Sequence, residues 1–154
     1  MSNFSSPVLP CLCASLRRAA RATTQLYEQE LRPTGLSSSQ FTILQALSLM
    51  KELTQGQMAR ALAMDSTSLT RTLAIMIRNG WIEKQAGEDR RERRLSLSHV
   101  GERLFRTAVP YWEKAQTQLK QRLGQGQAKA LMQLTNQVTD AAAVLTAQET
   151  GGAE

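Results

Sequence analysis

The sequence has few residues of the types that carry catalysis, metal binding or disulfide cross-linking. Its 154 residues include one histidine, His99, and two cysteines, Cys11 and Cys13. A single histidine excludes a Ser-His-Asp triad and a histidine-rich zinc site. The two cysteines are too close in sequence to staple a fold, so we expect a reducing, cytoplasmic compartment. No glycine-rich phosphate-binding motif is present, so we predict no cofactor, no metal and no enzyme activity.

Aromatic residues and long apolar runs are also scarce. Aromatics make up 5% of the chain, so Leu, Ala, Ile, Val and Met must supply most of the core. The apolar stretch over residues 8–14 is interrupted by Pro10, and residues 33–50 contain many Ser, Thr and Gln. We therefore expect neither a signal peptide nor a membrane span.

The composition is that of a basic globular protein. Hydrophobic residues make up 42% and charged residues 21%, and the length suits one domain. The 19 Lys and Arg residues exceed the 13 Asp and Glu residues, which gives a formal charge of +6. This excess favours a polyanionic partner such as nucleic acid, although it also fits a protein that is merely soluble.

Apolar residues recur at helical spacing over most of the chain. The pattern predicts helices over residues 10–33, 41–50, 54–62, 65–80, 100–123 and 128–145. Ser37 with Gln40, and Thr54 with Gln57, have the spacing of capping boxes, and Asp65 is the expected cap of the fourth helix. Pro110 should bend the fifth helix, and the glycines at 124 and 126 should separate it from the sixth.

Between the fourth and fifth helices the period changes. Residues 81–86 and 94–98 have the pattern of two short strands, and the charged segment 87–93 joins them as a hairpin tip. The order of short helix, tight turn, helix and hairpin is that of a winged helix-turn-helix. We therefore predict a mainly α fold with a small two-stranded β-wing.

The fourth helix carries candidate DNA-reading side chains at its N-terminal end. Hydroxyls and arginine near a helix start can reach base edges and phosphates in a major groove, where the helix N-terminus itself favours an anion. An ordinary polar face, with serines that only cap the helix, would have the same composition. The candidates are Ser66, Thr67, Ser68, Thr70 and Arg71.

The hairpin tip carries four arginines in five positions. Arginines at a loop tip can enter a narrow minor groove or bind phosphate. The alternative is a charged turn that is only solvated and binds nothing. Asp89 is placed to pair with neighbouring arginines and hold them in register. The candidate arginines are Arg90, Arg91, Arg93 and Arg94.

With these motifs in this order, the sequence resembles the MarR family of winged helix-turn-helix transcriptional regulators over about residues 12–145. The most specific segments are 36–41, 64–71 and 87–94. Asp89 and Arg91 match the Asp-x-Arg core of the family's wing, which implies that Arg91 enters the minor groove and Asp89 orients it. The candidates on the fourth helix match the family's recognition-helix positions.

The resemblance also implies an assembly and a function. Residues 1–154 would form a single MarR-type domain, with a DNA-binding lobe at about 36–98 and dimerisation helices at about 10–33 and 100–146. The expected protein is a homodimer that binds a palindromic operator in double-stranded DNA. It would be a repressor released by a small ligand or by cysteine oxidation. The alternative is a constitutive architectural DNA-binding protein that has no effector.

Two features bear on the effector. In the hydroperoxide-sensing branch of the family a reactive cysteine lies near the start of the first helix; Cys13 matches its spacing from a tyrosine, here Tyr27. Arg17 replaces a second expected tyrosine, but its charge would favour the Cys13 thiolate. Cys11 is the other candidate thiol, and both cysteines could instead be small hydrophobes at a dimer interface.

The second feature is a group of aromatic residues that either line a small-molecule pocket or belong to the core: Phe105, Tyr111 and Trp112.

Overall fold

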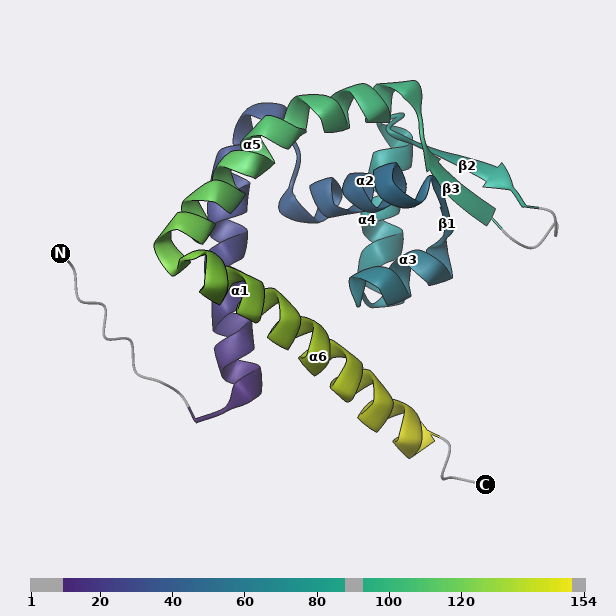
Figure 1. Ribbon diagram of the computed structural model, residues 1–154. Helices are drawn as coiled ribbons and strands as arrows, with labels where there is room; N and C mark the ends of the chain where they lie inside the picture. Colours follow the sequence, from purple (N-terminus) through teal and green to yellow (C-terminus); the bar gives the residue numbers. More distant parts are fainter. Residues whose placement is uncertain (1–9, 88–92, 151–154) are drawn as a thin grey trace.

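The computed structural model describes residues 10–87 and 93–150 of the chain. Figure 1 shows long helices at both ends of these residues, a lobe of shorter helices with a hairpin between them, and a further long helix that leads from the hairpin to the last helix. The elements in order are α1 (Leu12–Leu31), a 3-10 helix (Arg32–Thr34), α2 (Ser38–Met50), β1 (Glu52–Thr54), α3 (Gln55–Leu62), α4 (Ser66–Arg78), β2 (Ile82–Ala86), β3 (Arg93–Leu97), α5 (His99–Leu123) and α6 (Gln125–Thr150).

The predicted helix caps are confirmed. The Ser37 hydroxyl accepts the Gln40 N–H at 3.2 Å, and the Gln40 side chain accepts the Ser37 N–H at 2.9 Å. Thr54 and Gln57 form the same reciprocal pair at 3.1 and 2.8 Å. Each box satisfies N–H groups that a helix start leaves without a partner, so these local sequences set where α2 and α3 begin.

The sheet contains the predicted hairpin and one strand more. β2 and β3 pair antiparallel, from Ile82 opposite Leu97 to Ala86 opposite Arg93. On the other edge of β3 lies β1, which gives the strand order β1-β3-β2. β1 was not predicted from the sequence, because three residues are too few for a strand pattern. Its hydrogen-bonding partner lies some forty residues away in the chain, and pairing with that partner creates the strand.

A largely aliphatic core fills the lobe between α2, α4, the sheet and α5. Phe41 is its central aromatic residue, with its ring centroid 5.4 Å from that of Phe105 and 5.7 Å from that of Trp112. The two partner rings come from α5, so this cluster fastens α5 to the lobe. The fully buried large side chains are Leu31, Phe41, Ile43, Leu44, Leu47, Met58, Leu69, Met76 and Leu95.

A tight joint connects the hairpin to α5. The buried Ser98 hydroxyl donates to the Gly80 carbonyl and accepts the Gly101 N–H at 3.0 Å. A β-carbon at position 101 would overlap the Trp81 carbonyl oxygen, so the first turn of α5 can lie against this backbone only because residue 101 is glycine. The base of the hairpin and the start of α5 are therefore fixed relative to each other.

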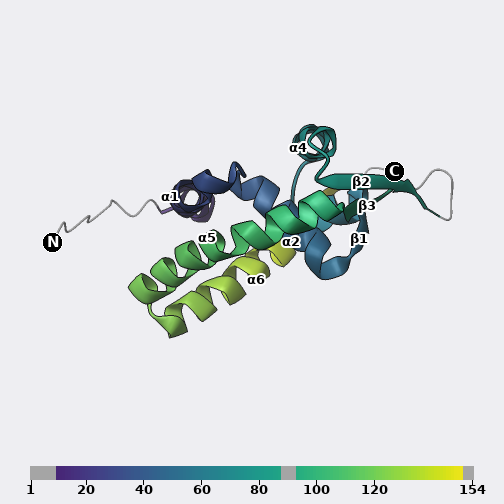
Figure 2. The same ribbon diagram turned by 90° about the horizontal axis from the view of Figure 1, so that it is seen from above.

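The long helices differ partly from expectation. α5 contains Pro110 and bends along its length (Figure 1). Gly124, at φ +84°, ends α5 as predicted, but Gly126 lies inside α6, where a break was expected. α6 begins at the end of α5 and diverges from it toward the C-terminus (Figure 1), although the two helices overlap when seen from above (Figure 2). Within residues 10–87 and 93–150 no helix is long and apolar enough to cross a membrane.

Candidate nucleic-acid interface

A three-residue turn at Ala63–Asp65 sets α3 against α4. Ala63 adopts the left-handed conformation at φ +48°, and its N–H donates to the Arg60 carbonyl at 3.2 Å. The Gln55 side-chain amide donates to the Thr70 hydroxyl at 2.6 Å and so ties the start of α3 to the first turns of α4. Gln55 was not predicted as part of this site, because no local sequence pattern indicates a contact between residues fifteen positions apart.

α4 divides into a buried face and an exposed face. Leu69, Leu73 and Met76 are buried in the lobe. The polar side chains predicted to read DNA are all exposed at the N-terminal end of this helix: Ser66, Thr67, Ser68, Thr70 and Arg71. The structure thus brings these five candidates together on one solvent-facing surface, as a helix that enters a groove requires.

Thr70 has a structural task as well. Its hydroxyl donates to the Ser66 carbonyl at 2.7 Å while it accepts from Gln55. The hydroxyl proton and one lone pair are therefore used inside the protein. Thr70 therefore connects α3 to α4 through these hydrogen bonds, whereas the side chain of the next residue, Arg71, is exposed to solvent.

The start of α4 is fixed by Asp65. Its carboxylate accepts the Ser68 N–H at 2.8 Å, and this hydrogen bond lowers the pKa of the Asp65 carboxyl below its ordinary value. A carboxylate also interacts favourably with the positive end of the helix dipole. The first turn of α4, which holds the candidate contacts, is thereby capped and held in place.

The wing is described in part. Arg93 and Arg94 lie on β3, where Arg93 is exposed and Arg94 lies 3.8 Å from the Glu52 carboxylate of β1. Asp89, Arg90 and Arg91 lie outside the described residues. Both strands that lead to the tip are anchored in the sheet, so the hairpin extends from the lobe as Figure 1 shows.

Comparisons with known proteins agree with this geometry. The MarR family model matches residues 34–92. The chain is 30% identical over 94 residues to YwoH of Bacillus subtilis, an uncharacterized HTH-type transcriptional regulator; these residues are 61% of this chain and 69% of YwoH. The chain belongs to the MarR family. As a member it is a DNA-binding transcriptional regulator, and not an enzyme.

Solved structures show the same fold. The M. tuberculosis transcriptional regulator MosR, in complex with DNA, is 32% identical with a TM-score of 0.80, over 88% of this chain and 98% of that protein. A cysteine-to-serine variant of MarR from E. coli, complexed with operator DNA, is 20% identical with a TM-score of 0.75, over 89% of this chain and 99% of that one. The predicted winged-helix fold is confirmed.

The two cysteines of this MarR-family chain lie at the start of α1. Cys11 precedes the first turn and Cys13 lies in it; both are free thiols and both are exposed in the single chain. Arg17 follows Cys13 by one turn. Tyr27 lies fourteen residues after Cys13 in α1, which is about 21 Å along the helix axis. Within one chain the Tyr27 side chain therefore does not reach Cys13. Burial raises the pKa of the Tyr27 hydroxyl.

A cavity of about 370 Å³ lies between α1, α2 and α5. Trp112, one of the aromatics in question, lines it, while Phe105 lines a different cleft and Tyr111 packs against the core. Tyr27 contributes from α1 and Ser38 from the start of α2. The cavity therefore lies where the N-terminal helix meets the DNA-binding lobe.

Proposed function

We propose that this regulator is a homodimeric repressor that binds a palindromic operator through two copies of α4 and two wings. The observation that carries the proposal is the exposed, capped N-terminal end of α4, with Arg71 and the serine and threonine side chains on one surface. Arg93 and Arg94 on β3 continue the basic surface toward the tip. Asp89, Arg90 and Arg91 would complete it, by resemblance to the family's wing.

We also propose that the chain is a single domain with a DNA-binding part and a dimerisation part. Residues 36–98 would form the DNA-binding lobe, and residues 10–33 and 100–146 the dimerisation helices. Support comes from α6, on which the large apolar side chains are exposed, whereas α2 and α4 bury several of theirs in the lobe, among them Phe41, Leu44 and Leu69. Such an exposed stripe is typical of a helix that packs against a partner.

The wing and the recognition helix should contribute to binding in different ways. Arg91→Ala should weaken operator binding by about 1–3 kcal/mol, through lost minor-groove and phosphate contacts. Changing Ser68 or Arg71 should instead alter which base pairs are preferred, because these positions face base edges. DNA-binding titrations on a panel of operator variants separate the two effects. Arg122→Ala, an exposed arginine near the end of α5, serves as the control.

A footprint decides between a regulator and an architectural protein. A regulator protects one short palindrome with a large ratio of specific to non-specific affinity. A protein that coats DNA with little sequence preference would contradict the proposal and favour the architectural alternative. Unchanged operator affinity in Arg91→Ala would show that the wing assignment is wrong.

Release by oxidation is the first of two proposed effector mechanisms. The thiolate of Cys13 would attack an organic hydroperoxide, so that the O–O bond breaks, the sulfur becomes a sulfenic acid and the alkoxide leaves and takes a proton. The exposure of Cys13 supports access, and Arg17 one turn away supports the thiolate. A polar group added at the start of α1 would disturb a dimer interface there. Tyr27 could meet Cys13 only across that interface.

The cysteine hypothesis requires two results together. Hydroperoxide should release the wild-type protein from its operator, and Cys13→Ser should bind DNA normally yet ignore hydroperoxide. Cys11→Ser is the matched control, two positions away on the same exposed segment. If Cys13→Ser is still released and Cys11→Ser is not, Cys11 is the reactive thiol. If neither substitution matters, the cavity between α1, α2 and α5 becomes the candidate effector site.

A further inference from the structure

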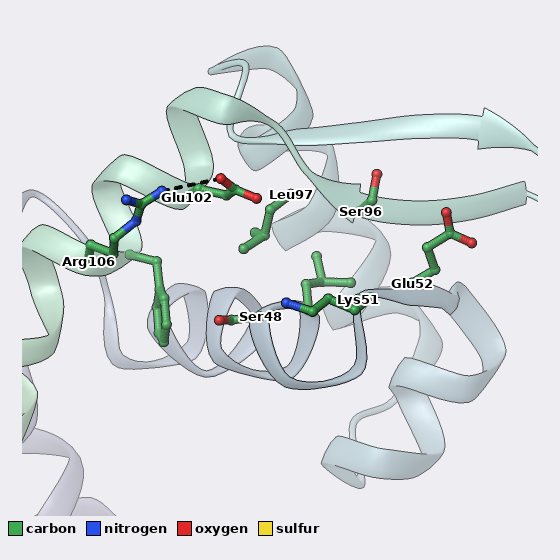
Figure 3. A pocket seen from close by; sticks show the side chains of 9 residues that line it. Ser48, Lys51, Glu52, Ser96, Leu97, Glu102 and Arg106 are labelled. Atoms are coloured by element: carbon green, nitrogen blue, oxygen red, sulfur yellow. Dashed lines mark hydrogen bonds and ion pairs between the residues drawn. The ribbon is translucent and has the colours of Figure 1, made fainter.

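A second cleft lies at the base of the wing, away from the cavity between α1, α2 and α5. Its volume is about 450 Å³, in the range of small-molecule sites. Figure 3 shows side chains that converge on it from the end of α2, from β1 and β3, and from the first turns of α5. The lining residues are Leu47, Ser48, Lys51, Glu52, Ser96, Leu97, Glu102, Phe105 and Arg106.

Lys51 enters this cleft from an unusual backbone conformation. It lies at φ +67° and ψ −58°, a region that side-chain-bearing residues rarely adopt, and its N–H donates to the Leu47 carbonyl at 2.9 Å. Glycine would adopt this conformation at no steric cost. Strained residues of this kind concentrate at functional sites, where the strain places a side chain. Here it places the lysine side chain along the α2 side of the cleft, with its ammonium directed toward Ser48 (Figure 3).

The other charges of the cleft are neutralised. Arg106 lies 3.3 Å from the Glu102 carboxylate on the same helix, and Arg94 lies 3.8 Å from the Glu52 carboxylate. Within the described part of the chain no ion pair involves Lys51. The Lys51 ammonium group is therefore not part of an ion pair, and it lies in a cleft whose apolar lining includes Leu97 and Phe105.

We propose that this cleft binds a small monocarboxylate with an apolar tail. The carboxylate would pair with the Lys51 ammonium and accept a hydrogen bond from the Ser48 hydroxyl. The tail would lie on Leu97 and Phe105. The paired carboxylate of Glu102 would repel the ligand head from the α5 side and direct it toward Lys51.

The position of the cleft connects it to the wing. Leu97 is the last residue of β3, the strand that bears Arg93 and Arg94 and pairs with β2. Glu52, on the cleft's rim, holds Arg94. A ligand that pairs with Lys51, the residue before β1, and lies on Leu97 of β3 would therefore change how the wing is held, and with it the affinity for DNA. This coupling rests on the proposed function, but binding in the cleft does not.

Binding is tested on the full chain without DNA, by an NMR titration with hexanoate. We expect saturable shifts of the backbone amides of Lys51, Ser96 and Leu97. Acetate and 1-hexanol, which lack the tail and the charge respectively, should bind at least tenfold more weakly. Lys51→Met, which removes the charge, and Lys51→Gly, which also relieves the strain, should each lose at least tenfold in affinity. Arg103→Gln, an exposed arginine near Arg106 on α5, should bind as the wild type does.

Several results would overturn the site. These are shifts that grow linearly without saturation, equal binding of 1-hexanol, full affinity in Lys51→Gly, or saturable shifts confined to the cavity that Thr42 and Trp112 line. Hexanoate should also weaken DNA binding of the wild type but not of Lys51→Gly; saturable binding with unchanged DNA affinity overturns the coupling. A wild-type chain that binds hexanoate but no operator would contradict the proposed function and leave the site standing.

Discussion

At the scale of single residues, Asp65 gives α4, the proposed recognition helix, a dependence on pH. Its pKa is lowered chiefly by the hydrogen bond from the Ser68 N–H, so its folded value lies below that of the unfolded chain. A depressed pKa contributes stability that is present above the unfolded value, near 3.8 to 3.9, and is lost as pH falls through the folded value. The first turn of α4 should therefore weaken below about pH 4.

Asp65→Asn isolates this effect. Asparagine is a good N-cap that carries no charge, so its cap is insensitive to acid. We expect the melting temperature of the wild type, relative to that of Asp65→Asn, to fall as the pH is lowered from 6 to 3. Thermal unfolding by circular dichroism at matched salt measures this difference. A difference that stays constant over that range would show that the Asp65 carboxylate does not stabilise α4.

At the scale of elements, one carboxylate connects α1 to the DNA-binding lobe. Glu28 accepts both the Ser38 N–H, at 2.7 Å, and the Ser38 hydroxyl, at 2.8 Å, at the first turn of α2. A second link runs from Glu30 to Lys114 of α5 at 2.8 Å. Since α1 belongs to the proposed dimerisation helices, the Glu28 contact holds the lobe at one angle to that helix.

Glu28→Ala should therefore disturb both stability and DNA recognition. Removal of an acceptor from a half-buried N–H costs about 1–3 kcal/mol, measurable by denaturant unfolding. A loosened lobe should also tolerate operators whose half-sites are moved apart by one or two base pairs, which wild-type protein should reject. Glu113→Ala, at an exposed position on α5, is the control. If both variants behave alike, the contact does not position the lobe.

Elements whose signals are local could be predicted from the sequence. The capping boxes, the Asp65 cap and the β2–β3 hairpin depend on residues within a few positions of one another, and all were found. β1, the Gln55–Thr70 bond and the Glu28–Ser38 bond depend on residues brought together only by the fold. The strained turn at Lys51 was missed for another reason: its sequence favours no such conformation, and the packing of α2 against the sheet imposes it.

At the scale of the whole molecule, α6 leaves an apolar face exposed in the single chain. After Ala128, which is 7% exposed, its apolar side chains stand in solvent: Leu134 is 58% exposed and Leu145 64%. Leu134, Val138, Ala141 and Leu145 follow one another at intervals of three and four residues and so form one stripe. Full burial of an exposed large side chain contributes about 1.5–3 kcal/mol, and these half-exposed side chains would contribute part of that amount on packing against a partner. A second copy that buries the stripe would therefore form a stable homodimer.

The double substitution Leu134→Glu with Val138→Glu tests this assembly. Among the described residues the lobe core contains no α6 side chain, so the helical circular dichroism signal should persist while sedimentation shows a monomer. Asn136→Glu, on the opposite side of α6, should remain dimeric. Because a dimer engages two half-sites at once, its loss should lower affinity for a full palindrome by roughly 10²–10⁴-fold. Affinity for an isolated half-site should hardly change. A folded wild-type monomer at micromolar concentration would contradict the dimeric architecture, and full palindrome affinity in a monomeric variant would show that one lobe reads the operator alone.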